Sequence, residues 1–255
     1  MIDAPLHVCL AGLDVVIFGA ERTRVPVIFV EHGRGGCKEH CFDYCRELQM
    51  DGCIAITIDQ RNHGARTVDP ACNGGWSSSH ATDMYGCLVG LAMDISLLID
   101  LLPARLGIDV GRVGMTGVSM GGHATLLAMA YDSRIAVGAP LIGGGDYRHL
   151  MELRAQTNSV PFDDFSNYYP PGLDAMVRRY DPIHHAARFA DRPLLLLNGE
   201  DDTLVQIDCN RRFYTAALPH YTDPTRLCLS AYPGIGHEAP PAMWQEARAW
   251  LNRWL

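Results

Sequence analysis

Short apolar runs and helical patterns alternate along most of the chain, and this alternation constrains the fold more than any other feature. The run Pro193–Asn198 (PLLLLN) shows no polar alternation, as expected for a central parallel strand covered on both faces. The segment Thr82–Leu102 repeats apolar residues at steps of four, three and four from Leu91 onward, which is the spacing of one helix face. Strands separated by helices require a mostly parallel sheet with right-handed crossovers. The sequence therefore predicts the α/β class, with helices on both faces of a central sheet.

The remaining elements follow from the same patterns. Strands are expected at Leu13–Phe18, Pro26–Glu31, Cys53–Asp59, Arg112–Thr116, Ile135–Ile142 and Thr225–Ala231. Helices are expected at Glu39–Met50, His123–Tyr131, Ile207–Leu218 and Ala242–Leu255. The first two strands follow each other closely, which suggests an antiparallel edge. Pro103 is expected to end or kink the helix that precedes it.

One segment interrupts the alternation. Residues 143–180 are too long for a simple connection and carry proline, tyrosine and phenylalanine in an irregular pattern. A long excursion of this kind usually forms a lid or a binding loop. There is no internal repeat and no linker, so residues 1–255 are expected to form a single domain, with 143–180 as a small cap after the sixth strand.

Composition and charge argue against several classes of protein. The chain is 48% hydrophobic with a net charge of −8, and it lacks the basic stripe that a nucleic-acid surface needs. No apolar run approaches the roughly 18 residues that span a bilayer, and Met1–Asp14 lacks the pattern of a signal peptide. The nine cysteines, an odd number without an export signal, indicate free thiols in a reducing compartment. We therefore expect a cytoplasmic protein that binds neither nucleic acid nor membrane.

The strongest chemical signal is Arg112–Ala130 (RVGMTGVSMGGHATLLAMA), which contains a G-x-S-x-G pentapeptide around Ser119. The pentapeptide is common, but here it lies between a predicted strand and a predicted helix. A sharp turn there exposes the Ser119 hydroxyl, and side chains in place of Gly117 and Gly121 would collide across it. The helix that follows points its N-terminus at the site and favours developing negative charge. Ser119 is thus the predicted nucleophile.

A serine hydroxyl needs a base, and the base needs a carboxylate to orient it. His237 lies in YPGIGHEAPP, on a glycine-containing loop after the last predicted strand, and is the expected base. Asp202 follows the central strand in LLLLNGEDDTLV and is the preferred acid. Glu200 and Asp201 are lesser candidates, and Asp146 offers a second place from which a carboxylate could reach the histidine.

Together these motifs resemble the α/β-hydrolase superfamily, in particular its serine esterase and peptidase branch, which includes prolyl-oligopeptidase catalytic domains and dienelactone-hydrolase-like carboxylesterases. The similar pieces arrive in the family's order and are HGRGG at 32–36, DQRNHG at 59–64, GVSMGG, RPLLLLNGEDDTLV and YPGIGH. The chain order of Ser119, Asp202 and His237 is also that of the family. The resemblance covers most of the chain from Pro26 onward and implies an acyl-transfer mechanism.

The resemblance also implies an oxyanion hole built from two backbone amides. One is that of Met120, directly after the nucleophile, and the other is that of Arg34, in the loop after VIFVE. The glycines around Arg34 keep this backbone open to substrate. The Arg34 side chain either lies in solvent or faces the pocket, where it would bind a carboxylate.

One departure from the family pattern is Asn62 in DQRNHG, where glycine is usual. We interpret this loop as structural, with Arg61 and His63 holding the turn. The departure then affects no residue of the predicted catalytic set.

The stretch after the HGRGG loop carries Cys37, Cys41 and Cys45 at intervals of four, with His40 beside them. A structural zinc site usually takes pairs of cysteines from two chain segments, and the second pair is missing here. We interpret the three cysteines as the buried stripe of the predicted helix, and a metal or redox site is the alternative.

Aromatic residues of the cap, with one tryptophan from another loop, are the expected walls of the substrate pocket, because ligands of such sheets bind beyond the carboxyl ends of the strands. The expected substrate-binding residues are Trp76, Tyr147, Phe162, Phe165, Tyr168 and Tyr169. Aromatic residues would equally serve as the core of the cap itself. A cap of this size favours a small or medium-sized substrate.

The predicted function is that of a serine carboxylesterase, which acts on small to medium-sized esters through an acyl-enzyme without cofactor or metal. A peptidase, amidase or thioesterase with the same three residues is the main alternative, and a ligand sensor on a hydrolase scaffold is another. The expected partner is a small-molecule ester. The closing helix, with Trp244, Trp250 and Trp254, either packs on the sheet or pairs with a second subunit as a homodimer.

Overall fold

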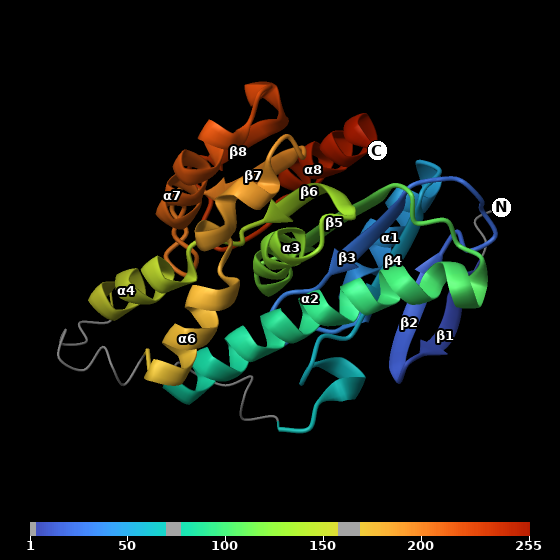
Figure 1. The fold of residues 1–255 in the computed structure, drawn as a ribbon, viewed down its shortest axis with the longest axis horizontal. Helices are drawn as coiled ribbons and strands as arrows, with labels where there is room; N and C mark the ends of the chain where they lie inside the picture. The colour runs from blue at the N-terminus through green and yellow to red at the C-terminus, as the bar shows by residue number, and fades with distance from the viewer. Residues whose placement is uncertain (1–3, 70–77, 158–168) are drawn as a thin grey trace.

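The computed structural model describes residues 4–69, 78–157 and 169–255, and within these ranges eight strands form one sheet. Their spatial order is β1-β2-β4-β3-β5-β6-β7-β8 (Figure 1). Strand β2 is antiparallel to β1 and β4, and all other neighbours are parallel. The strands are β1 (Leu6–Leu10), β2 (Leu13–Phe18), β3 (Val27–Glu31), β4 (Ile54–Ile58), β5 (Val113–Val118), β6 (Ile135–Leu141), β7 (Leu194–Gly199) and β8 (Leu227–Tyr232). The predicted α/β class is confirmed.

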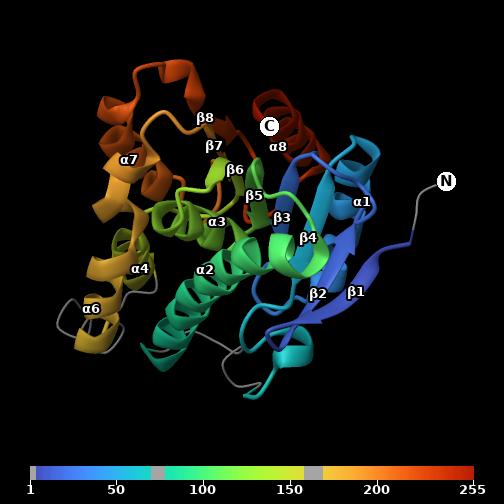
Figure 2. The same cartoon turned by 45° about the vertical axis from the view of Figure 1, so that its right-hand side comes forward.

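Helices cover both faces of the sheet (Figures 1 and 2). The α-helices are α1 (Phe42–Met50), α2 (Ser78–Leu106), α3 (Met120–Tyr131), α4 (Tyr147–Thr157), α6 (Pro171–Tyr180), α7 (Asp208–Ala217) and α8 (Pro241–Trp254). The short 3-10 helices are η1 (Lys38–Cys41), η2 (Gly64–Arg66), η5 (Pro182–Phe189), η6 (Leu218–His220) and η7 (Pro224–Arg226). Helices α1 and α8 pack on one face, and α2, α3, α6 and α7 pack on the other.

Strand β2 shows why the strands read as nearly continuous apolar runs. Val15 and Ile17 belong to the core beneath α2 and α3, whereas Val16 and Phe18 belong to the core beneath α1. Successive side chains of a strand point to opposite faces, and here both faces are buried.

The expected pairing at the start of the chain is wrong in one respect. Strand β2 (Leu13–Phe18) does not pair with β3, the next strand along the chain. Its neighbours in the sheet are β1 on one side and β4 on the other. The sequence pattern did not indicate β1, whose residues are mostly exposed at the sheet edge. Ala11 and Gly12 have φ angles of 49° and 80° and close the hairpin between β1 and β2, the conformation that matches the twist of paired strands.

Helix α2 continues through Pro103 to Leu106 and is longer than predicted. A window within Ala81–Leu106 has a mean hydropathy of 1.9, so by length and composition this helix is apolar enough to cross a bilayer. The expectation that the chain has no such run is therefore wrong. In the structure 61% of that window is buried against the rest of the chain, as in a core helix.

The segment 143–180 is helical at both described ends, as α4 and α6, where the sequence pattern suggested irregular structure. The buried side chains of α4 include Tyr147, Leu150, Met151 and Arg154. These positions repeat at the spacing of one helix face. Helix α4 therefore turns both an aromatic ring and a guanidinium toward the protein interior.

Glu31, the last residue of β3, carries a deeply buried carboxyl group. It is 1% exposed, and neither side-chain oxygen has a hydrogen-bond partner among the residues that the structure describes. Burial, followed by the nearby Asp59 and Asp94, raises the pKa of this carboxyl well above its ordinary value. A glutamate in the unfolded chain ionises near pH ~4.3. As pH rises from there toward the higher folded-state pKa, ionisation favours the unfolded chain, so Glu31 lowers the stability of the native state at neutral pH.

Replacing Glu31 with glutamine is expected to remove this loss. Urea unfolding at a series of pH values should show that Glu31→Gln is more stable than the wild type at pH 7, and that the difference shrinks toward about pH 4. Glu21→Gln, at an exposed glutamate, is the control and should follow the wild type. A Glu31→Gln protein with the pH dependence of the wild type would contradict a protonated, buried carboxyl at this position.

Candidate active site

Ser119 lies in the turn between β5 and α3 and has φ 55° and ψ −109°, a strained conformation for a residue with a side chain. Its amide donates to the Leu141 carbonyl at 2.9 Å, which fixes the turn against β6. At the two flanking glycines, Gly117 and Gly121, there is no space for a side chain. A Cβ atom on Gly121 would lie 2.3 Å from the Glu31 carbonyl oxygen, and one on Gly117 would lie 2.7 Å from the same atom. The turn expected from G-x-S-x-G is present.

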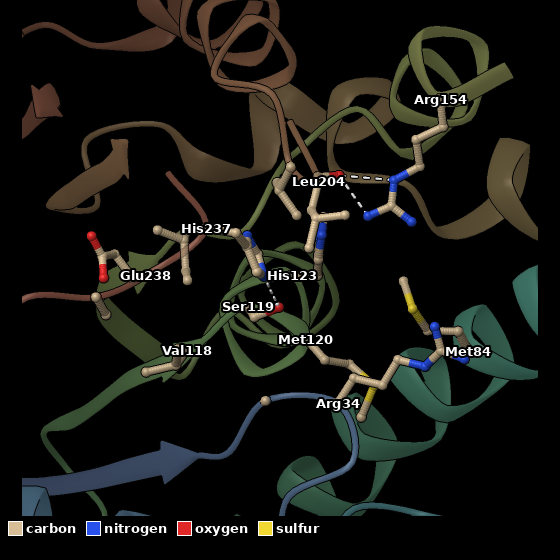
Figure 3. A pocket seen from close by; sticks show the side chains of 14 residues that line it. Arg34, Met84, Val118, Ser119, Met120, His123, Arg154, Leu204, His237 and Glu238 are labelled. Atoms are coloured by element: carbon tan, nitrogen blue, oxygen red, sulfur yellow. Dashed lines mark hydrogen bonds between the residues drawn. The ribbon is translucent and has the colours of Figure 1, made fainter. Parts of the chain in front are cut away.

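Three side chains from three loops meet at this turn, and Figure 3 shows two of them, Ser119 and His237. The Ser119 Oγ lies 2.8 Å from His237 Nε2, and His237 Nδ1 lies 2.7 Å from an Asp202 carboxylate oxygen. The other oxygen of Asp202 accepts the amides of Leu204 and Val205, both at 2.8 Å. In this arrangement His237 donates from Nδ1 to the buried aspartate, which leaves Nε2 as the acceptor for the serine proton. The structure thus brings together the serine, histidine and aspartate that the sequence singled out.

The other carboxylates considered for the acid lie elsewhere. Asp146 is buried, accepts from Arg212 Nε at 2.8 Å and caps the first turn of α4 through the His149 amide. Glu200 and Asp201 are exposed next to Asp202. Only Asp202, of the four, has a carboxylate bonded to His237.

The HGRGG loop lies beside Ser119, and Gly33, Arg34 and Met120 line the same cavity. Met120 is the first residue of α3, so its amide has no acceptor within the helix. The loop is attached to the next strand end, because Gln60 Nε2 donates to the His32 carbonyl at 2.5 Å and the Gln60 amide donates to His32 Nε2 at 3.2 Å. The positions suit the predicted oxyanion donors, whose role stays a prediction.

The cavity at Ser119 has a volume of about 430 Å³. Its apolar walls are Met84, Val118, Met120, Ile142, Leu204, Val205 and Ala239. No tyrosine, phenylalanine or tryptophan lines it among the described residues. The described residues therefore do not form the aromatic pocket wall that the sequence predicted.

Tyr147 and Tyr169 were expected in the pocket wall, and both lie in the core instead. Tyr147 is 1% exposed, donates from its hydroxyl to the Ala81 carbonyl and packs on Tyr85 with ring centroids 4.6 Å apart. Tyr169 is also buried. Their rings serve as the core between the cap helices and α2. The other expected wall residues, Trp76, Phe162, Phe165 and Tyr168, lie outside the described residues.

Charged groups complete the cavity. Arg34 and Arg154 lie on one side of Ser119 and Glu238 on the opposite side (Figure 3). The Arg34 side chain is half-buried and faces the pocket, one of the two placements left open by the sequence. Burial, together with the positive charge of Arg34, lowers the pKa of Arg154 to about 10.

Arg154 and His123 were not among the predicted site residues. His123, one helical turn after Ser119, lines the cavity, and burial lowers its pKa to about 4, so its imidazole is neutral at pH 7. Its Nδ1 lies 2.8 Å from the Gly144 carbonyl. The spacing from Ser119 was a signal for His123. Arg154 was signalled only by the repeat of buried positions along α4.

The cysteines that follow the HGRGG loop lie in and before α1. Cys41 and Cys45 pack in the core with Leu48, and burial raises the pKa of both thiols. Cys37 precedes η1 and is half-buried. Among the described residues, no group of histidine, cysteine and acidic side chains is arranged to hold a metal ion. The buried-stripe interpretation fits Cys41 and Cys45 but not Cys37.

The DQRNHG loop is held by side chains at its base. Asn62 has φ 59°, a conformation that asparagine tolerates better than most residues, and its side-chain oxygen accepts the amides of Val68 and Asp69. Arg61 and Arg66 both pair with Asp94 on α2. The contacts are those of a structural loop, and they explain how asparagine replaces glycine here.

A serine, histidine and aspartate in hydrogen-bonded series, beyond the carboxyl ends of a mostly parallel sheet, define a hydrolase-type site. Comparison with known families agrees with this geometry. The chain belongs to the alpha/beta hydrolase family, whose model matches residues 27–254. The resemblance inferred from the motifs is confirmed.

Individual relatives are distant. The chain is 26% identical over 235 residues to the putative esterase YitV of Bacillus subtilis, covering 91% of this chain and 90% of that protein. It is 23% identical over 227 residues to the esterase YjfP of Escherichia coli, covering 88% and 86%. The crystal structure of TT1662 from Thermus thermophilus superimposes with a TM-score of 0.80 at 23% identity, over 100% of this chain and 98% of that one. The structural likeness shows a common fold.

Asp202→Asn tests the assignment of the acid. The amide cannot stabilise a protonated His237 as a carboxylate does, so hydrolysis of an activated ester should fall by about 10⁴-fold, with the fold unchanged by circular dichroism. The neighbouring, exposed Asp201→Asn is the matched control and should retain the rate of the wild type. Equal losses in the two variants would remove Asp202 from the catalytic set.

Proposed function

We propose that this protein is a carboxylesterase that hydrolyses small to medium-sized esters through an acyl-enzyme on Ser119. The observation that carries the proposal is the continuous series of short contacts from Asp202 through His237 to Ser119 at an open cavity. The similarity to an esterase and a putative esterase over most of their lengths supports the same conclusion.

In the proposed reaction the Ser119 Oγ attacks the ester carbonyl carbon while His237 Nε2 takes the hydroxyl proton. The negative charge that develops on the carbonyl oxygen is stabilised by the amides of Met120 and Arg34 and by the N-terminus of α3. His237 then returns the proton to the leaving alcohol oxygen. Water, deprotonated by His237, attacks the acyl-enzyme, and His237 returns that proton to Ser119 Oγ as the carboxylic acid is released. Asp202 stabilises the imidazolium in both halves of the reaction.

The cavity supports a substrate of limited size. A volume of about 430 Å³ lies in the lower part of the range for small-molecule sites. The apolar part of the wall consists of aliphatic side chains and methionines, which suit an alkyl or acyl chain. The size of the cavity and its apolar wall therefore favour a simple ester over a long polypeptide as the substrate.

A panel of p-nitrophenyl esters from acetate to decanoate tests this function. The wild type should hydrolyse the shorter esters, and Ser119→Ala should lose at least about 10³-fold in kcat/KM because the nucleophile is absent. Ser133→Ala, at an exposed serine beyond the other end of α3, is the matched control and should keep full activity.

The p-nitroanilides of the same acids separate an esterase from an amidase. Turnover of the anilides with a kcat/KM comparable to that of the esters, despite the much poorer leaving group, would reassign the bond that is cleaved. A wild type inactive toward the whole panel, or a Ser119→Ala variant as active as the wild type, would contradict the proposal.

A further inference from the structure

Arg154 makes a contact that links the cap to the acid of the catalytic set. It lies on α4, is 9% exposed and lines the cavity. Its Nε and Nη2 atoms both donate to the Leu204 carbonyl, at 2.8 and 2.5 Å (Figure 3). Two donors of one guanidinium therefore converge on a single backbone oxygen.

Leu204 belongs to the same turn as Asp202. Its amide donates to Asp202 Oδ1 at 2.8 Å, while its carbonyl accepts from Arg154. The backbone of Leu204 is thus held at both ends, by the catalytic carboxylate on one side and by α4 on the other. A continuous series of hydrogen bonds runs from Arg154 through Leu204, Asp202 and His237 to Ser119.

Packing alone holds this turn incompletely. The Leu204 side chain is 45% exposed, so burial of that side chain fixes its backbone weakly, although the neighbouring Val205 is buried. Charge-assisted hydrogen bonds are stronger and more directional than neutral ones. The Arg154 contact therefore supplies an orientation that the apolar part of Leu204 does not.

The position of Arg154 is electrostatically costly. Burial and the charge of Arg34 both disfavour its protonated form, and the Asp202 carboxylate is among the groups that oppose this effect. A buried cation that bonds a backbone carbonyl in the acid's own turn, instead of lying in solvent, is a feature that fold stability alone does not require.

We propose that Arg154 is a positioning residue for Asp202, which holds the 202–205 turn so that the carboxylate keeps its bond to His237. Arg154 acts through Leu204 and not on the reacting atoms. This inference rests on the proposed ester hydrolysis for its kinetic readout, and it assigns to the cap helix α4 a part in the geometry of the catalytic set.

A double-mutant cycle tests the proposal. Arg154→Met keeps much of the side-chain volume and removes the donors, and it should lower kcat for a short neutral p-nitrophenyl ester by about 10- to 100-fold, the scale of a small misplacement of a catalytic group. In the background of Asp202→Asn, the same substitution should lower kcat by less than about 3-fold, because its effect passes through Asp202. Equal losses in the two backgrounds would overturn the proposal, since a binding role or a general structural role acts independently of Asp202.

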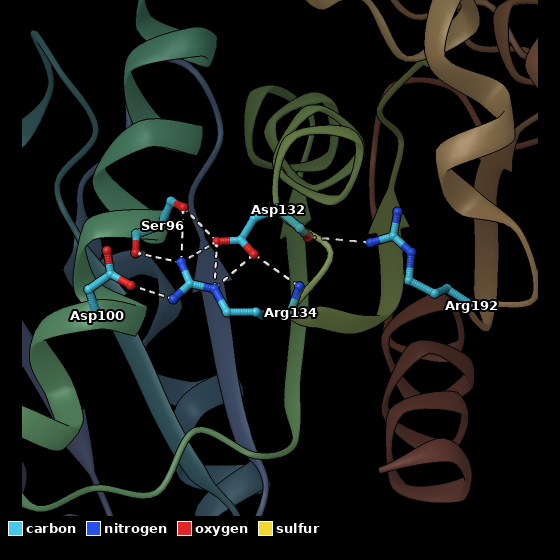
Figure 4. Close-up of polar contacts among 5 residues, drawn as sticks. All are labelled: Ser96, Asp100, Asp132, Arg134 and Arg192. Carbon is cyan, nitrogen blue, oxygen red and sulfur yellow. Dashed lines mark hydrogen bonds and ion pairs between the residues drawn. The ribbon is translucent and has the colours of Figure 1, made fainter.

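Arg192→Met is the matched control. Arg192 also bonds backbone carbonyls, those of Met129 and Ile135 at 2.7 and 3.0 Å, but at the far end of α3 from Ser119; Figure 4 shows it beside Asp132. Its loss should lower the unfolding temperature with little change in kcat. If Arg154→Met does not fold, Arg154→Lys, which keeps the charge and one donor, replaces it in the same cycle with a smaller expected loss.

The outcome also separates this inference from the proposed function. If the wild type hydrolyses no ester, the esterase proposal fails, and the rate at which a fluorophosphonate labels Ser119 takes the place of kcat. Slower labelling of Arg154→Met than of Arg192→Met, with the difference abolished by Asp202→Asn, would support the positioning role. Equal labelling rates of the two arginine variants would overturn it.

Discussion

The approach of α3 to the end of β3 is the constraint on which the rest of the site depends. Gly121 lies so close to the Glu31 carbonyl that no side chain fits between the helix and the strand. This contact fixes Ser119 in its strained turn and places it beside the HGRGG loop, which leaves the same end of β3. Because β3, β5, β7 and β8 are parallel, the loops that carry Arg34, Ser119, Asp202 and His237 all leave the sheet at one edge.

Much of this arrangement could be predicted, because it depends on local patterns. A strand, a glycine-flanked serine and a helix in series specify the turn at Ser119 without knowledge of the rest of the chain. Asp202 and His237 each follow a strand, so a parallel sheet alone brings them to the edge where Ser119 lies. The choice of Asp202 over Asp201 is also local, since the turn that follows satisfies one carboxylate oxygen with backbone amides.

The remainder depended on contacts between distant segments. Strand β1 is an exposed edge whose partner is set by a two-residue hairpin, and the place of β4 between β2 and β3 is a matter of sheet order, which local patterns do not specify. From the sequence, the aromatic residues of the cap were equally consistent with a wall of the substrate pocket and with the core of the cap. For Tyr147 the register of α4 decides between them, because it turns this ring inward together with Arg154.

The apolar surface of α2 has a consequence for the chain during its synthesis. The helices that pack against it, α3 and α6, come later in the sequence, so α2 leaves the ribosome before its cover exists. Apolar surface that is exposed during folding favours aggregation, and α2 is the described helix whose length and composition make this surface large. The order of the elements thus leaves the apolar surface of α2 without its α3 and α6 partners until those two helices have been synthesised.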